Sequence, residues 1–81
     1  MTLRAVVIGC GHYLPARVVE NAEFEATLET DDAWIRSRSG IERRHFAAEG
    51  ETTSMMATAA ARRALVDAGL NADDVDAVVV A

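Results

Sequence analysis

The stretch from Thr53 to Ala68 carries the strongest periodic pattern in this chain of 81 residues. Its apolar residues recur at spacings of one and three, which places them on one face of an α-helix. Because most of them are alanine, such a helix can approach its neighbour closely. Gly69 follows where a helix favours a left-handed C-terminal residue. We therefore expect a helix over Thr53–Ala68, packed tightly inside a layered α/β fold.

Two apolar runs flank this helix in the sequence. Ala5 to Ile8 and Ala77 to Ala81 contain only Ala, Val and Ile, without polar alternation. Such runs are typical of strands that are covered on both faces. A polar turn, Asn71 to Asp74, precedes the second run. Two strands without a visible third neighbour leave an open sheet edge, so we expect residues 1–81 to be the N-terminal fragment of a larger domain.

Between these runs the sequence predicts two short helices and one extended piece. Asn21 can cap a helix that continues through Leu28. Thr30 can cap a second helix, because two acidic residues follow it where the positive end of the helix dipole favours them. Gly40 is available to end that helix. We expect residues 41–47 to be extended.

The composition indicates an ordinary globular protein and argues against several functions. The chain is 51% apolar and 26% charged, with a net charge of −5. An acidic chain is a poor nucleic-acid binder, since that binding depends on Lys and Arg displacing counterions. No stretch approaches the length of a membrane span, and the N-terminus lacks the order of a secretory signal. We therefore expect a cytoplasmic protein with no nucleic-acid or membrane partner.

Gly9 and Gly11 imitate the start of a dinucleotide-binding fingerprint. Leu14 stands at the third glycine position, and Pro15 follows where the helix that holds the pyrophosphate should begin. Both requirements of that turn are missing. We interpret the two glycines as residues that let the chain turn at the end of a strand.

Cys10 is the single cysteine, and as a nucleophile it would need a general base and an oxyanion site. His12 shares its face in an extended segment, but cysteines at strand ends are more often inert small hydrophobes. His12 and His45, with one cysteine, are too few for a metal site of usual ligand spacing. We expect no catalytic residue and no metal ligand in this chain.

The segment from Thr30 to Phe46 combines the only tryptophan with four arginines. On a helix, Trp34 and Arg38 lie four residues apart on one face. An exposed indole beside a guanidinium can stack on a flat heteroaromatic ring and hold a phosphate. Alternatively, Trp34 is a core residue and the arginines only solvate the helix. The residues alone leave both interpretations open.

The chain also carries an ordered set of motifs: G-x-G-x-Y-L-P, N-A-E, T-x-D-x-W-I, S-G-I-E-R-R-H and E-T-T-S. This order resembles the start of β-ketoacyl-acyl-carrier-protein synthase III, over nearly the whole chain. The resemblance implies a thiolase-like α/β fold with α-β-α-β-α layers, of which this chain is the first part. It also implies that Trp34 stacks on the adenine of coenzyme A, that Arg38 meets the phosphates and that Thr30 lies beside the adenine.

The same resemblance implies a function. The family enzyme moves an acyl group from acyl-CoA to a cysteine, then condenses it with malonyl-acyl carrier protein and initiates fatty acid synthesis. Coenzyme A thioester is its substrate, no cofactor is needed, and a homodimer is expected. The catalytic Cys, His and Asn would follow residue 81. Two alternatives stay open: a starter-unit condensing enzyme of secondary metabolism, and a free-standing nucleotide-binding or interaction module.

Two positions depart from the family pattern. Ala33 stands where the family often has Glu, which would form a capping box with Thr30. Met55 stands where the family often has an acid. We expect the missing box to cost at most about 1 kcal/mol and to loosen the helix that carries Trp34.

Overall fold

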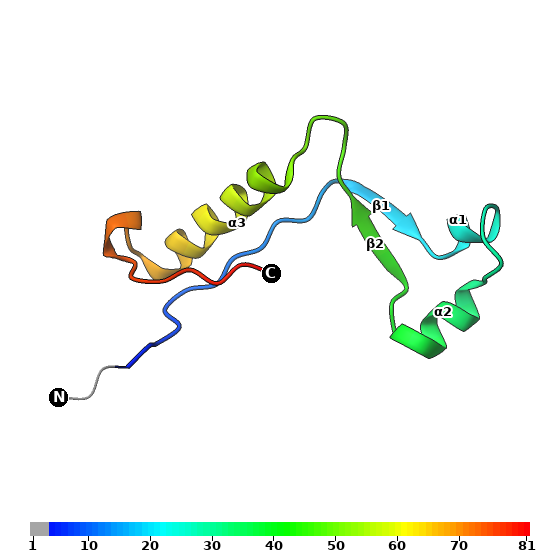
Figure 1. Cartoon of the computed structure of the whole chain (residues 1–81), viewed down its shortest axis with the longest axis horizontal. Coiled ribbons are helices and arrows are strands. Elements are labelled where there is room, and N and C mark those ends of the chain that lie inside the picture. Colours follow the sequence, from blue (N-terminus) through cyan, green and yellow to red (C-terminus); the bar gives the residue numbers. More distant parts are fainter. Residues whose placement is uncertain (1–3) are drawn as a thin grey trace. The chain divides into compact units, whose positions relative to one another are not determined.

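The computed structural model describes residues 4–81, which divide into two compact units. One unit combines the chain up to Tyr13 with Glu51–Ala81, and the other is Leu14–Gly50. In chain order the elements are β1 (Arg17–Glu20), α1 (Ala22–Glu25), α2 (Asp32–Ser39), β2 (Arg43–Phe46), α3 (Thr53–Ala68) and the short 3-10 helix η1 (Ala72–Asp74), as labelled in Figure 1.

The long helix α3 has the bounds that the sequence predicts. Thr52 precedes it in an extended conformation, and its hydroxyl accepts a hydrogen bond from the Met55 N–H at 3.2 Å. Gly69 ends the helix in the left-handed region with φ of 68°. Both ends are therefore set by local chemistry, which is why the prediction for this element is confirmed.

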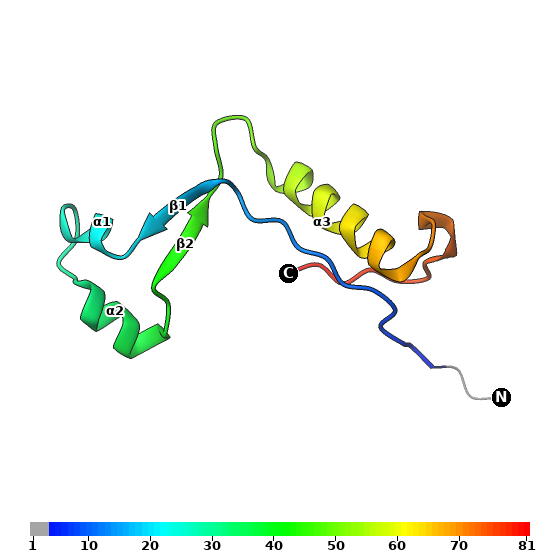
Figure 2. The ribbon, with the colours of Figure 1, turned by 180° about the vertical axis from the view of Figure 1, so that it is seen from behind.

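Residues 9–13 pass along α3 (Figure 1, Figure 2), and two glycines make the contact close. A Cβ atom on Gly9 would lie 2.5 Å from the Ala64 carbonyl oxygen and 2.8 Å from the Ala68 Cβ. A Cβ atom on Gly11 would also clash with the α3 backbone. Neither glycine has a positive φ. The expectation that they provide a turn is wrong, because they serve close packing against the alanine face.

Polar contacts add to this packing. Arg63 Nη1 donates a hydrogen bond to the His12 carbonyl oxygen at 2.8 Å, and the Tyr13 hydroxyl donates to the Glu51 carboxylate. That hydrogen bond raises the pKa of Tyr13, because loss of the phenolic proton would bring two negative groups together. Residues 9–13 are thus tied to α3 and to the segment before it.

The two apolar runs do not form strands. Residues 5–8 and 77–81 have no strand assignment, and the sheet of the described residues contains only β1 and β2. Val7 is 83% exposed and Val79 is 96% exposed. The prediction of two buried strands is therefore wrong for this structure. Apolar composition favours a strand, but a strand exists only where a neighbour accepts and donates its backbone hydrogen bonds.

The second unit is organised by a two-stranded antiparallel sheet of β1 and β2, in which Val19 pairs with Arg44. The expected extended piece, residues 41–47, is confirmed by β2. Strand β1 is only four residues long and was not predicted from the sequence. Val19 is 1% exposed and Val18 is 44% exposed, so Val19 is the buried residue of β1.

Helix α1 follows β1 directly and is shorter than expected. It ends at Glu25, although the Leu28 N–H still donates to the Phe24 carbonyl oxygen at 2.8 Å. Leu28 is 58% exposed, so little burial is available to stabilise another turn. Asn21 occupies the N-cap position as predicted, but its side chain makes no capping bond to this helix.

Helix α2 begins one residue later than expected. Its N-cap is Asp31, whose carboxylate accepts from the Trp34 N–H at 2.8 Å. Thr30 therefore lies before the cap, and the expected cost of a capping box missing between Thr30 and Ala33 does not arise. Gly40, with φ of 73°, ends α2 as predicted.

Candidate functional site

Trp34 and Arg38 lie together on an exposed face of α2. The Arg38 Cζ atom is 5.5 Å from the centroid of the indole ring, as the four-residue spacing predicts. The Trp34 side chain is 55% exposed, so it does not belong to the core of its unit. Among residues 4–81, no carboxylate forms a salt bridge with Arg38. An aromatic surface and an unpaired positive charge therefore stand side by side.

Thr30 lies immediately before the N-cap of α2. Its Oγ1 atom is buried and has no hydrogen-bond partner among the described residues. A buried hydroxyl without a partner lowers stability, because it has lost its water without gaining a replacement. The Thr30 N–H is occupied, since it donates to the Leu28 carbonyl oxygen at 2.9 Å. The side chain thus retains hydrogen-bonding capacity next to the helix that carries Trp34.

Arg36 differs from Arg38 in its partners, although both belong to α2. Its Nε atom is 3.3 Å from Asp32 Oδ2, and its Nη1 atom is 3.6 Å from Glu42 Oε1. Two carboxylates therefore neutralise Arg36 within its own unit. The arginine beside the indole is the one better suited to bind an anion.

Asn21 is the most connected side chain of this unit, and it is only 1% exposed. Its Nδ2 atom donates to Asp32 Oδ1 at 2.9 Å and to the Ile41 carbonyl oxygen at 2.7 Å. Its Oδ1 atom accepts from Arg44 Nη2 at 2.5 Å. Sequence reasoning missed this role, because it depends on contacts across the chain. No local signal in the sequence indicates it, since Asn21 follows another polar residue, Glu20.

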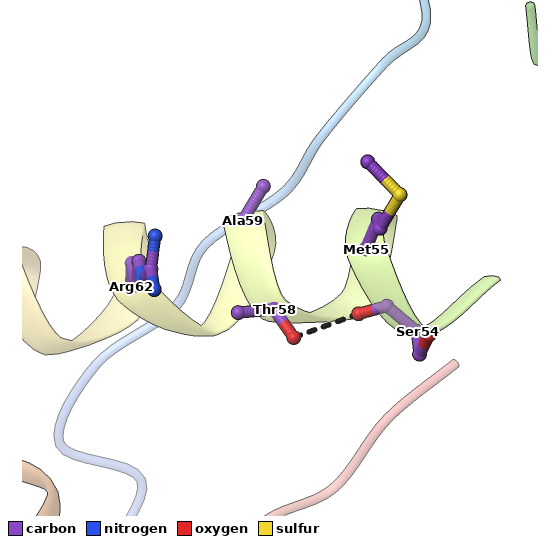
Figure 3. Close-up of a pocket in the computed structure, with 5 residues that line it drawn as sticks. All are labelled: Ser54, Met55, Thr58, Ala59 and Arg62. Atoms are coloured by element: carbon purple, nitrogen blue, oxygen red, sulfur yellow. Dashed lines mark hydrogen bonds between the residues drawn. The ribbon is translucent and has the colours of Figure 1, made fainter. Parts of the chain in front are cut away.

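Two shallow hollows of the described residues lie away from Trp34 and Arg38. The first, of about 300 Å³, lies on α3 and is lined by Ser54, Met55, Thr58, Ala59 and Arg62 (Figure 3). Its Thr58 hydroxyl already donates to the Ser54 carbonyl oxygen at 2.7 Å. The second, of about 290 Å³, is lined by Glu20, Asn21, Ala22, Asp32, Arg36, Glu42 and Arg43. The candidate site is an exposed helix face, since Trp34 is 55% exposed.

The other chemically active side chains have structural surroundings. The Cys10 N–H donates to Asp67 at 3.0 Å, and no hydrogen bond joins the Cys10 thiol to the His12 ring in the described part of the chain. The Nδ1 atom of His45 is 2.6 Å from the Pro15 carbonyl oxygen. Within residues 4–81, no group of three His, Cys, Asp or Glu side chains could hold a metal ion. No helix of those residues is long and apolar enough to cross a membrane.

Curated relatives match this chain over its whole length. Synthases named β-ketoacyl-acyl-carrier-protein synthase III, from Ruegeria sp. (strain TM1040) and Rhodobacter capsulatus, are 79% and 75% identical over 81 residues. The chain spans 25% of the length of each of these two relatives. No protein-family profile matches the chain.

Solved structures agree with these relatives. A 3-oxoacyl-acyl-carrier-protein synthase III from Aquifex aeolicus VF5 has a TM-score of 0.76 at 43% identity, over 85% of this chain and 22% of its own. The priming β-ketosynthase of the R1128 polyketide pathway has a TM-score of 0.77 at 40% identity, over 86% and 21%. The expected fold class is confirmed: the chain forms part of a thiolase-like condensing-enzyme fold. Within that class, the resemblance to β-ketoacyl-acyl-carrier-protein synthase III is confirmed over all 81 residues.

Proposed function

We propose that this chain is the N-terminal part of a β-ketoacyl-acyl-carrier-protein synthase III, within the first thiolase-like domain. The complete enzyme would take an acyl group from acyl-CoA and condense it with malonyl-acyl carrier protein, which starts fatty acid synthesis. The proposal is supported by a relative with that name, which is 79% identical to this chain over all 81 residues. The exposed apolar runs at residues 5–8 and 77–81 would then find strand partners in the rest of the enzyme.

The exposed face of α2 forms one wall of the coenzyme A site in this proposal. Trp34 stacks on the adenine, Arg38 binds the phosphates, and the Thr30 hydroxyl lies beside the adenine. The observation that carries this assignment is the exposed indole with an unpaired guanidinium 5.5 Å from its centroid. Thr30 lies directly before the N-cap of α2, on the same helix start as Trp34.

The role of these residues is binding, and the chemistry takes place elsewhere in the enzyme. Coenzyme A thioester is the substrate, and neither a metal nor a redox cofactor is required. We place the enzyme in the cytoplasm as a homodimer, without a nucleic-acid or membrane partner. The net charge of −5 supports the absence of a nucleic-acid role.

The first prediction separates the two half-reactions in the complete synthase that carries this sequence. Trp34→Ala should weaken acyl-CoA binding by about 5-fold to 150-fold, which corresponds to roughly 1–3 kcal/mol for one stacked base. Arg38→Ala should also weaken acyl-CoA binding. This loss of affinity should become smaller as the salt concentration rises, because ions screen an exposed charge. Condensation of the preformed acyl-enzyme with malonyl-acyl carrier protein should change little, since that donor carries no adenine.

The matched control is Arg62→Ala, which removes an exposed arginine from α3 and should leave acyl-CoA binding unchanged. Affinities come from equilibrium titration, and each half-reaction is followed by product formation. Unchanged affinity in both α2 variants, with a lower melting temperature for Trp34→Ala, would show that the indole is only structural.

A second candidate function is starter-unit condensation in secondary metabolism. The likeness to the R1128 priming β-ketosynthase favours it, with a TM-score of 0.77. The relatives at 79% and 75% identity favour fatty acid synthesis instead. Assaying the complete enzyme with carrier proteins of both kinds distinguishes them, and a preference for a polyketide carrier protein would support the second function.

A further inference from the structure

Helix α2 has two faces of different character. At 3.6 residues per turn, successive side chains are rotated by about 100°, so Asp32 and Arg36 share one side while Trp34 and Arg38 point the opposite way. Asp32 is half-buried, and the exposed Arg36 pairs with Asp32 and Glu42, whereas Trp34 and Arg38 are exposed and form no salt bridge within residues 4–81. One face is therefore held by the rest of the unit, and the other is open to a ligand.

The Asn21 side chain is hydrogen-bonded near both ends of α2. One Nδ2 hydrogen bond reaches Asp32, the first residue of α2, at 2.9 Å. The other reaches the carbonyl oxygen of Ile41, two residues beyond the end of α2, at 2.7 Å. A single amide group thus connects the entry and the exit of α2 to the end of β1.

Further hydrogen bonds fix Asn21 itself. Its Oδ1 atom accepts from Arg44 on β2, and its backbone N–H donates to the Glu42 carbonyl oxygen at 3.2 Å. Glu42 and Asp32 both pair with Arg36. The contacts form a closed ring through Asn21, Asp32, Arg36 and Glu42. Asn21 is the buried member of this ring, at 1% exposure, and its three side-chain hydrogen bonds leave its amide little freedom to rotate.

We propose that Asn21 is the positioning residue of the coenzyme A site. Its amide sets the rotation of α2 about its axis, and therefore the direction in which Trp34 and Arg38 project together. This inference rests on the proposed function of that face, and Asn21 itself touches no ligand. Binding groups lose their effect when the shell that supports them is loose, because small displacements spoil stacking and charge alignment.

The test uses Asn21→Asp in the complete synthase. The substitution preserves side-chain size and the acceptor for Arg44, but it removes both N–H donors and places a second carboxylate beside Asp32. Coenzyme A affinity should fall about 10-fold or more. The rate of condensation on preformed acyl-enzyme should stay within about twofold, because malonyl-acyl carrier protein brings no adenine to α2.

A second substitution tests the same contact from its other side. Adding Asp32→Asn to Asn21→Asp exchanges the amide and the carboxylate, which restores a hydrogen bond between the two positions. Coenzyme A affinity should then recover in part, a coupling that independent sites do not show. If Asn21→Asp does not fold, Asp32→Ala removes the same link and should produce the same loss of affinity. The matched control is Asn71→Asp, at an exposed asparagine outside the network.

Trp34→Ala, measured in parallel, separates this proposal from the proposed function. The positioning role alone would be overturned if Trp34→Ala lost coenzyme A affinity while Asn21→Asp and Asp32→Ala kept an affinity within twofold of wild type. Unchanged affinity in Trp34→Ala would overturn the proposed site and this inference with it. Equal losses in coenzyme A binding and in condensation would assign Asn21 a general structural role and also overturn the inference.

Discussion

At the scale of single residues, the clearest result concerns glycines that have no unusual backbone conformation. Gly9 and Gly11 have no positive φ, yet added Cβ atoms would meet the backbone of α3. The backbone of a helix cannot rotate away as a flexible side chain can. Close packing therefore requires both the glycines and the alanine face of α3.

This packing predicts the effect of Gly11→Ala. The substitution should lower the free energy of unfolding of the complete synthase by about 1–3 kcal/mol, the usual cost of forcing extra volume into a packed contact. The control is Gly50→Asn: Gly50 has φ of 85° and open space around its Cβ position, and Asn tolerates that conformation. Denaturant unfolding measures both. A Gly11→Ala protein as stable as wild type would show that the segment does not pack closely.

The candidate binding residues could be predicted from residue type and spacing, whereas the residues that support them could not. Trp34 and Arg38 were found because a helix of any packing places them together. Asn21 was assigned to a cap because Asn favours that position, whereas its side chain contacts residues 11, 20 and 23 positions away. Contacts across such separations leave no periodic signal in a sequence.

At the scale of elements, α3 could be predicted with its ends and α2 only approximately. The α3 sequence combines a long apolar face with a terminal glycine, and Thr52 caps its start in an extended conformation. Before α2, Thr30 and Asp31 are both suitable caps. The backbone selects Asp31, which has φ of −140° and ψ of 170°. Where two neighbouring residues can both act as the cap, the first residue of a helix can be predicted only to within one position.

The capping of α2 gives a further prediction. Asp31→Ala should destabilise the complete synthase by about 1 kcal/mol, since the Trp34 N–H loses its acceptor. Thr30→Val should cost little, because it removes a buried hydroxyl that has no partner among the described residues. Denaturant unfolding gives the free energies, and hydrogen exchange at the Trp34 amide should be faster only in Asp31→Ala. The opposite order would indicate that Thr30 is the cap.

At the scale of the whole molecule, the fold class was predicted correctly from the sequence, although the two strands predicted at residues 5–8 and 77–81 are absent from this structure. The apolar runs at residues 5–8 and 77–81 have the composition of covered strands, but they are exposed in this structure. Pairing is a property of neighbours, and the chain spans only 22% of the Aquifex aeolicus synthase structure that it resembles. The fold class could be predicted from the order of the motifs and from the alanine face of α3, because neither depends on the hydrogen-bond partners of a strand.

The central claim is that the exposed face of α2 binds the adenine end of coenzyme A. The most direct test compares acyl-CoA with the corresponding acyl-pantetheine, which has the same thioester but no nucleotide, in the complete synthase. Trp34→Ala should lower the affinity for acyl-CoA by about 5-fold to 150-fold and leave the affinity for acyl-pantetheine unchanged. Equal losses for the two donors, or no loss for acyl-CoA, would contradict the claim.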